Sequence, residues 1–329
     1  MEFNFNYVIF NGSDGNYGPY NDEGYFSICL HDLWPLENVV INSAPLDYTN
    51  KFLRLLNRIH CSPHLNLPFQ NIWSPYFFKN TLKDDKPICF LLMTNLSSIY
   101  LKWLKQHYPT AVFIRYYRDL VETQQDQYDR LLSTGVIDYW MSFDELQAQK
   151  YGMHYYHEIE SKMEFPFDTQ IKYDVFFSAR AKKRLKKIVQ AYDRLTAKGY
   201  KCFFYITGAS KDEMEFREGI VYSNNLMSYK TMLQYSIQSK CLLDINQQNA
   251  VGYTSRLIEA IMYNKCLLTD NETIKTTSFY KPEFVEYFKD VEKIDGSVIN
   301  NYSKVDYLYN NEFSPLGLLA FIDQLIFKA

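Results

Sequence analysis

The chain has 329 residues, of which 47% are hydrophobic and 22% are charged, an ordinary balance for a folded protein with a substantial core and room for two domains. Its net charge of −3 argues against a general nucleic-acid binder. It contains no apolar run of the roughly 20 residues that cross a bilayer, and its first residues lack the basic segment of a secretory signal.

Cysteine and aromatic usage add two expectations. Four of the six cysteines, Cys89, Cys202, Cys241 and Cys266, lie in apolar runs of strand length, so we expect buried free thiols in a reducing compartment. The expected location is therefore cytoplasmic, with the inner face of the membrane as a further option. The 29 Tyr and 24 Phe suit stacking on sugars or bases, but they suit cores and interfaces equally well.

The first half alternates apolar runs with segments of helical period, which predicts a doubly wound α/β domain. Ser142 and Glu145 have the spacing of a capping box, which predicts a helix that starts there and ends near Gly152. Strands are expected at residues 7–10, 39–41, 88–92, 112–117 and 139–141, and helices at residues 48–59, 98–107 and 127–133.

The second half repeats the alternation after a segment without clear periodicity, residues 158–173, which we expect to be a linker. Its last element is a helix with apolar residues at helical spacing over residues 316–325. Strands are expected at residues 174–177, 202–206, 241–245 and 266–268, and helices at residues 185–195, from 228, and 255–263.

The turn before the helix at residues 255–263 has the features of a phosphate site. A loop with Gly252 leads to Thr254 or Ser255 as the helix N-cap. The N-terminus of a helix presents unpaired N–H groups and the positive end of the helix dipole. Arg256 stands in the first turn, where a cation is unfavourable, and this placement suggests that it meets an anion. The alternative is a solvated surface arginine.

Three segments of the second half carry a family resemblance. Residues 177–180, with Lys183 and Arg184, follow the strand that opens this half, and residues 229–244 give a helix and a strand. Residues 251–259 then read V-G-Y-T-S-R-L-I-E. This order resembles the donor domain of GT-B glycosyltransferases, whose glycogen-synthase-like members have E-G-F-G-L-x-x-x-E at the last segment. In the first half, residues 109–119, 137–144 and 150–152 resemble bacterial lipopolysaccharide and capsule glycosyltransferases.

The resemblance implies a GT-B fold, with two Rossmann-like doubly wound domains facing a central cleft. The acceptor domain would span residues 1–160 and the nucleotide-sugar donor domain residues 161–312. Residues 313–329 would form a helix that packs back on the N-terminal domain. The donor-binding residues implied are Arg180, Arg184, Gly252, Tyr253, Thr254, Ser255, Arg256 and Glu259.

The chain departs from the signature at two positions, with Val251 in place of its first Glu and Thr254 in place of its second Gly. In the family the first Glu touches the transferred sugar and the second holds the ribose hydroxyls. Only Glu259 can therefore take the family's ribose role, and its alternative is a surface acid that offsets the helix dipole. Gln247, Gln248 or Asn249 could replace the missing sugar contact with neutral hydrogen bonds. Four lysines, Lys182, Lys183, Lys186 and Lys187, suit a solvated helix face.

A catalytic base for the acceptor hydroxyl is required if the reaction inverts the sugar. Asp14 and Asp119 follow predicted strands, where ligands collect in open α/β sheets, and they are our catalytic candidates. A turn residue and a helix cap are the respective alternatives. His31 and Asp32 are further candidates in this half.

No cofactor is expected beyond the donor. The chain has no D-x-D triplet, which disfavours the metal-dependent GT-A class, and no G-x-G-x-x-G after the first strand, which disfavours a nicotinamide enzyme. The run from His60 to His64 contains two His and a Cys, but no second pair has zinc spacing, so we expect no metal there.

The resemblance therefore implies a glycosyltransferase that acts in surface polysaccharide biosynthesis, and the missing D-x-D triplet agrees with a metal-independent one. Its partners would be a nucleoside-diphosphate sugar and a saccharide acceptor, lipid-linked acceptors among them, with a peripheral membrane contact and no nucleic acid. Two alternatives stay open, a non-catalytic nucleotide-sugar-binding module of the same fold, motivated by Val251, and a sugar-nucleotide epimerase of the same two-domain shape.

Overall fold

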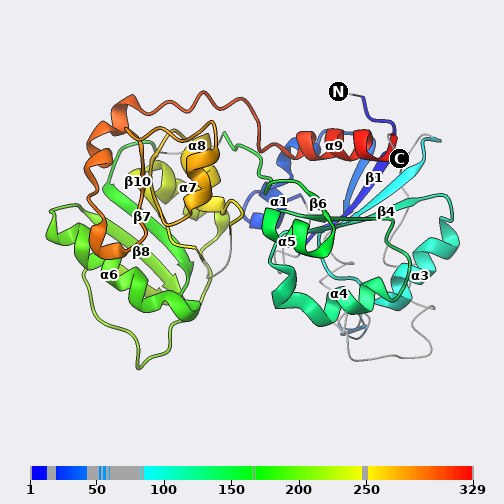
Figure 1. Cartoon of the computed structure of the whole chain (residues 1–329), viewed down its shortest axis with the longest axis horizontal. Coiled ribbons are helices and arrows are strands. Elements are labelled where there is room, and N and C mark those ends of the chain that lie inside the picture. The colour runs from blue at the N-terminus through cyan, green and yellow to red at the C-terminus, as the bar shows by residue number, and fades with distance from the viewer. Residues whose placement is uncertain are drawn as a thin grey trace. The chain divides into compact units, whose positions relative to one another are not determined.

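The computed structural model describes residues 2–12, 20–42, 52, 55–56, 59, 82, 85–164, 166, 168–246 and 251–327. It divides into two compact units, Met1–Ser161 with Phe313–Ala329, and Lys162–Glu312. Each unit contains one six-stranded sheet (Figure 1). Asp14, the run from His60 to His64 and most of the helix expected at residues 48–59 lie outside the described residues.

The sheet of the first unit is parallel and has the order β2-β1-β3-β4-β5-β6. The order reverses between β1 and β3, because the chain first adds β2 on one side and then continues on the other. The strands are β1 (Asn6–Phe10), β2 (Val39–Asn42), β3 (Ile88–Leu92), β4 (Val112–Tyr117), β5 (Tyr139–Ser142) and β6 (His154–Tyr155). The helices are α1 (Tyr25–Ile28), α3 (Ser98–His107), α4 (Gln125–Leu132), α5 (Glu145–Tyr151) and α9 (Pro315–Phe327).

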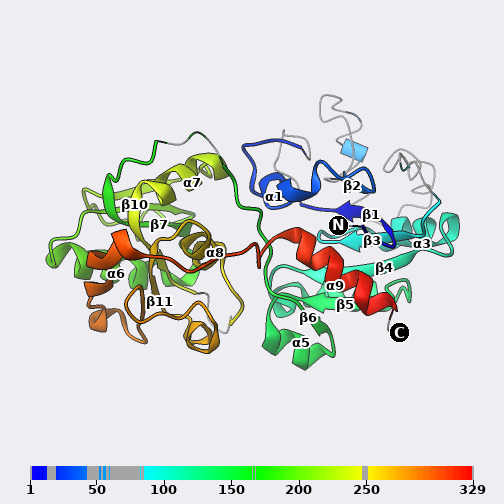
Figure 2. The same ribbon diagram turned by 90° about the horizontal axis from the view of Figure 1, so that it is seen from above.

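Both faces of this sheet are covered, which explains its continuous apolar strands. On β1, Tyr7 and Ile9 face one core cluster, which also contains Leu318, Leu319 and Ile322 of α9. Val8 and Phe10 face the opposite cluster, which contains residues of α3. Figure 2 shows α9, in red, lying over this sheet.

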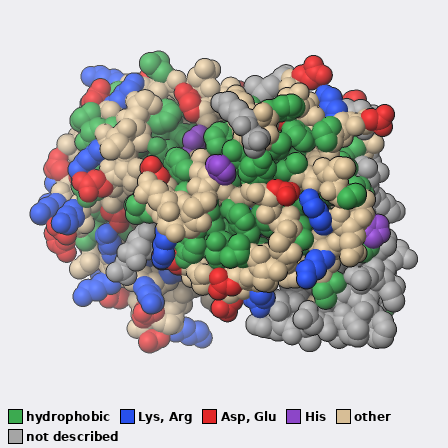
Figure 3. Space-filling model, turned by 45° about the vertical axis from the view of Figure 1, so that its right-hand side comes forward, with side chains coloured by type: hydrophobic (Ala, Val, Ile, Leu, Met, Phe, Trp, Pro, Cys, Tyr) green, Lys and Arg blue, Asp and Glu red, His purple; other side chains and the backbone are tan. Residues whose placement is uncertain are grey.

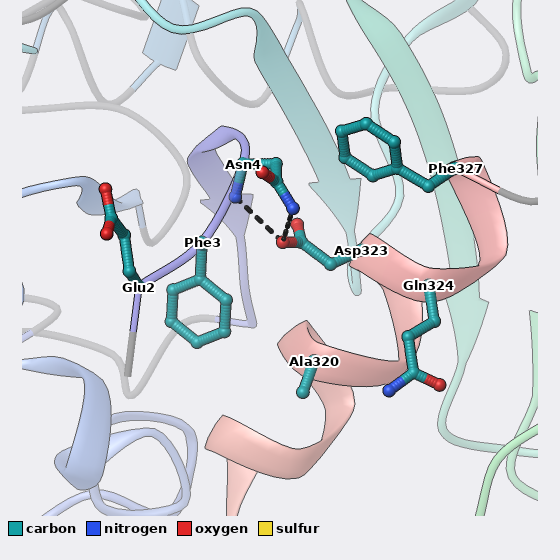
Figure 4. A pocket seen from close by; sticks show the side chains of 7 residues that line it. All are labelled: Glu2, Phe3, Asn4, Ala320, Asp323, Gln324 and Phe327. Carbon is teal, nitrogen blue, oxygen red and sulfur yellow. Dashed lines mark hydrogen bonds between the residues drawn. The ribbon is translucent and has the colours of Figure 1, made fainter.

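The last helix is held to the first strand by a buried carboxylate. Asp323 Oδ2 accepts hydrogen bonds from the main-chain N–H of Asn4 at 2.8 Å and from its Nδ2 at 3.0 Å. Asp323 Oδ1 accepts one from the Tyr7 hydroxyl at 2.5 Å. A surface hollow of about 280 Å³ lies beside these groups, between the N-terminal segment and α9 (Figure 4). Asp323 is occupied by these hydrogen bonds, and Glu2, the other acid that lines the hollow, pairs with Lys86 at 3.3 Å.

The structure corrects two local expectations in this unit. The helix α5 is capped by Asp144, whose side chain accepts from the Gln147 N–H, and Ser142 instead ends β5. The prediction of a capping box from Ser142 was wrong because β5 extends as far as Ser142. The linker expected from residue 158 was also placed too early, since Glu158 and Glu160 are buried, at 4% and 0% exposure.

The sheet of the second unit is also parallel, with the order β12-β11-β10-β7-β8-β9. Its strands are β7 (Tyr173–Arg180), β8 (Cys202–Thr207), β9 (Ile220–Ser223), β10 (Ser239–Asp244), β11 (Cys266–Thr269) and β12 (Val285–Tyr287). Its helices are α6 (Leu185–Ala197), α7 (Tyr229–Ile237) and α8 (Ser255–Met262). The two parallel sheets with their helices confirm two Rossmann-like domains.

The surface carries mixed charge. On the face drawn in Figure 3, Lys and Arg side chains are interspersed with Asp and Glu, in keeping with the small net charge. Among the described residues, no helix has both the length and the hydropathy of a membrane span.

Candidate functional site

The sheet of the second unit reverses its strand order between β7 and β10. The chain builds β8 and β9 on one side of β7, then returns to place β10, β11 and β12 on the other. In open α/β sheets, ligands bind outside the carboxyl ends of the strands at such a switch point. The carboxyl ends of β7 and β10 are therefore the expected place for groups that hold a ligand.

Two arginines cross this switch point in opposite directions. Arg184 follows β7, and its Nη1 donates to the carbonyl oxygen of Ile245, just beyond β10. Arg256 lies in the first turn of α8, after β10, and its Nη1 donates to the carbonyl oxygen of Ser178 on β7 at 2.6 Å. Burial lowers the pKa of Arg184, and the nearby charge of Arg256 lowers it further. The two guanidinium groups are therefore close enough to repel each other.

Arg184 retains hydrogen-bonding capacity at this edge. Its Nε is buried and makes no hydrogen bond in the described structure. A buried donor without an acceptor costs about 1–3 kcal/mol, and two neighbouring cations gain from an anion between them. These features point to an anion-binding site at the switch point.

The N-terminus of α8 lies at the same edge and is capped by Thr254, whose Oγ1 accepts from the Leu257 N–H at 3.3 Å. The same hydroxyl donates to Asp244 Oδ1 at 2.8 Å. Asp244 ends β10 and is fully buried, and its Oδ2 accepts from the Thr269 hydroxyl of β11 at 2.9 Å. One carboxylate therefore ties the helix cap to two strands.

A second carboxylate and an amide order the loops around the cap. Asp270 Oδ1 accepts from the Asn246 N–H at 2.7 Å, and its Oδ2 pairs with Lys187 at 2.6 Å. Asn271 Nδ2 donates to the carbonyl oxygens of Gly252 at 3.1 Å and of Val251 at 3.3 Å. Residues 251 and 252, in the described part of the loop that precedes α8, are thus held by Asn271, which follows β11.

Glu259 lies one turn into α8 and has no exposed surface. Its Oε1 accepts from the Tyr229 hydroxyl at 3.1 Å and its Oε2 from the Ser236 hydroxyl at 3.0 Å, so it joins α8 to α7. Burial raises its pKa to about 7, against an opposing effect of Arg256. The dipole-compensating surface role considered for Glu259 is wrong, because its carboxylate faces the interior.

The other residues expected to bind the donor are placed as follows. Arg180 ends β7 with an exposed side chain. Gly252 is buried, Tyr253 and Ser255 are half-buried, and Ser255 begins α8. The structure thus brings Arg184, Arg256 and the α8 cap together and leaves Arg180 at the rim.

Asp119, the described candidate for a catalytic base, follows β4 and is exposed, and its Oδ1 accepts from the N–H of Leu120 at 2.9 Å. Since β4 pairs with β3, Asp119 lies one strand beyond the reversal of the first sheet. Asp32 is engaged elsewhere, because it accepts from the Ser314 hydroxyl ahead of α9. Among the described residues, no group of three or more His, Cys, Asp or Glu side chains is placed to hold a metal ion.

Three residues of the site, Asp244, Asp270 and Asn271, were not predicted from the sequence. Each follows or ends an apolar run, Asp244 at the end of β10 and the other two after β11. That position was the available signal, since polar side chains at the carboxyl ends of neighbouring parallel strands meet at one edge of a sheet.

Comparison with solved structures identifies the fold. HepE of Anabaena, solved in complex with UDP and glucose, matches with a TM-score of 0.57 and 9% identity, over 98% of this chain and 99% of that chain. The UDP-N-acetylglucosamine 2-epimerase of Neisseria meningitidis, bound to UDP-GlcNAc, matches with a TM-score of 0.50 and 12% identity, over 98% and 99%. The chain has the GT-B fold. No family model and no curated protein matches the sequence.

The buried Glu259 predicts a pH-dependent stability for the second unit. Its pKa is about 7 in the folded protein against 4.5 in the unfolded chain, so the folded state binds the proton more tightly. The resulting stability is fully present below pH 4.5 and is lost as the pH rises through about 7, a loss on the order of 3 kcal/mol. Urea unfolding followed by circular dichroism at pH 5 and pH 8 would measure it.

Glu259→Gln is the control, because its amide does not titrate, and its stability should change less over this range. Burial also raises the pKa of Asp244, so the free energy of unfolding of Glu259→Gln should still fall with rising pH, but less steeply than that of the wild-type protein. Equal slopes for the wild-type protein and the variant would contradict the assignment to Glu259.

Proposed function

We propose that this protein is a glycosyltransferase that transfers a sugar from a nucleoside-diphosphate sugar to a saccharide acceptor. The observation that carries the proposal is the pair of arginines, Arg184 and Arg256, at the switch point beside the α8 N-terminus. Guanidinium groups bind phosphate oxygens in pairs of hydrogen bonds, and helix N-termini favour negative charge. Their positive charge and their hydrogen-bond donors support a diphosphate as the group bound here.

The same groups suggest how the chain promotes transfer. When the bond between the sugar and the diphosphate breaks, negative charge builds on the departing nucleoside diphosphate. Donors that are already in position stabilise such charge without reorganisation, and they are worth more where water is excluded. Arg184, Arg256 and the N-terminus of α8 would supply this stabilisation. The proposal therefore includes no cofactor beyond the donor.

The choice of donor and acceptor has separate support. HepE was solved with UDP and glucose and the Neisseria epimerase with UDP-GlcNAc, which favours a uridine nucleotide as the first donor class to test. The resemblance of the first half supports a saccharide acceptor of surface polysaccharide biosynthesis, lipid-linked acceptors among them, and a peripheral membrane contact. Asp119 and Asp14 remain the proposed catalytic bases of the acceptor domain.

Calorimetric titration with UDP, GDP, CDP and dTDP, without added metal, tests the donor site. We expect saturable binding of one of them, and then release of that nucleotide from its sugar conjugates when acceptor saccharides are added. Absence of binding to all four nucleotides would overturn the proposal. Binding without turnover of any conjugate would support the non-catalytic module instead.

A sugar-nucleotide epimerase is the second candidate, because the Neisseria enzyme shares the fold over nearly the whole chain. Incubation of UDP-GlcNAc with the protein alone separates the two, since epimerisation needs no acceptor. Proton NMR would show a second sugar nucleotide from an epimerase. It would show only the starting compound, or slow hydrolysis, from a transferase.

A further inference from the structure

The N-cap of α8 is held by a buried acid, Asp244, at the end of β10. An apolar residue would be the ordinary choice at a buried strand position. Asp244 has no exposed surface, and both of its oxygens accept from hydroxyl groups, Oδ1 from Thr254 and Oδ2 from Thr269. Burial of a carboxylate is costly unless its oxygens are satisfied. Such a residue in a strand end calls for an explanation beyond packing.

The direction of the hydrogen bonds supplies one. An ionised carboxylate only accepts, so Asp244 fixes the proton of the Thr254 hydroxyl toward itself. The lone pairs of Thr254 Oγ1 are then available to the helix, where Oγ1 accepts from the Leu257 N–H. A cap fixed in this way sets the position of the first turn of α8, which carries Arg256.

The charges at the site point the same way. Burial raises the pKa of Asp244, and the charge of Arg256 opposes that rise. Arg256 in turn donates to the carbonyl oxygen of Ser178 on β7, so two side-chain hydrogen bonds, joined by the first turn of α8, connect β10 with β7. Loss of the Asp244 carboxylate would free the Thr254 cap and would remove a negative charge near Arg256.

We infer that Asp244 is a positioning residue, which acts through Thr254 to place the α8 N-terminus and Arg256 against the diphosphate of the donor. The inference rests on the proposed function. It assigns Asp244 no contact with substrate, and it makes Thr254 the residue through which the effect passes.

A set of variants tests this by calorimetric titration with the nucleoside diphosphate that the wild-type protein binds. Asp244→Asn keeps the shape of the side chain and removes one acceptor, and Thr254→Val removes the hydroxyl. Each substitution should raise the Kd about tenfold. The Kd of the double variant should be no higher than that of the single variant that binds less tightly, because both act through the same cap. Thr254→Ser restores the hydroxyl and should bind like wild type.

Ser239→Ala is the matched control, since it removes a buried hydroxyl at the opposite end of β10, where Ser239 Oγ donates to the carbonyl oxygen of Tyr235 at 2.8 Å. It should lower the unfolding midpoint and leave the Kd unchanged, which separates positioning from general destabilisation. If the increases in Kd of Asp244→Asn and Thr254→Val multiply in the double variant, the two residues act independently and the inference is overturned. Wild-type affinity in both single variants would also overturn it. If the wild-type protein binds none of the nucleotides, the proposed function fails and this inference fails with it.

Discussion

Replacement of Arg256 by alanine is expected to raise the Kd for the nucleoside diphosphate about 10- to 100-fold, with the fold intact. A hydrogen bond from a charged donor to a charged acceptor contributes about 1.5–3 kcal/mol, which gives this range. Arg184→Ala should have an effect of similar size. With both removed, only the α8 N-terminus remains, and we expect the Kd to rise by about a thousandfold.

Two further variants sharpen this experiment. Arg256→Lys keeps the charge and loses the planar fork of the guanidinium, so its Kd should lie between those of the wild-type protein and Arg256→Ala. Lys186→Ala removes an exposed cation from α6, the helix that follows Arg184, and should leave the Kd unchanged. Calorimetric titration measures all of them. Equal affinity of Arg256→Ala, Arg184→Ala and the wild-type protein would place the donor site elsewhere.

The sequence was sufficient for the general plan of the fold. Long apolar runs such as β3 and β4 predicted buried parallel strands, because a strand covered on both faces has no polar alternation. The edge strands β6, β9 and β12 were missed. They are two to four residues long and carry exposed or half-buried positions, so they lack that signal.

The site was predictable where the signal was local. Arg256 stood out because a cation is unfavourable in the first turn of a helix, and Thr254 because its residue type suits an N-cap. Asp244 was read only as part of a strand, since its partners Thr254 and Thr269 are 10 and 25 residues away. Contacts of this kind depend on the strand order, which a single sequence does not specify.

The pair of Arg118 and Glu158 in the first unit shows the same limit most clearly. These residues are 40 positions apart, and Glu158 was expected to open a linker. Their side chains are 8% and 6% exposed, and Arg118 Nε donates to Glu158 Oε1 at 2.6 Å. Arg118 Nη2 also donates to the Tyr25 hydroxyl at 2.9 Å, and its Nη1 contacts Cys29 Sγ at 3.2 Å. The carboxylate is the main counter-charge of a buried guanidinium.

Glu158→Ala is therefore expected to destabilise the first unit by about 3–5 kcal/mol, because it leaves a buried cation unpaired. All four tryptophans, Trp34, Trp73, Trp103 and Trp140, belong to this unit, so urea unfolding followed by tryptophan fluorescence reports on it alone.

Joint replacement of the pair, Arg118→Met with Glu158→Leu, should destabilise the unit less than Glu158→Ala, since it removes both charges from the interior. Glu122→Ala, which breaks an exposed pair with Lys150, should change the midpoint little. If Glu158→Ala unfolds at the same urea concentration as Glu122→Ala, the pair does not hold this part of the chain to the sheet.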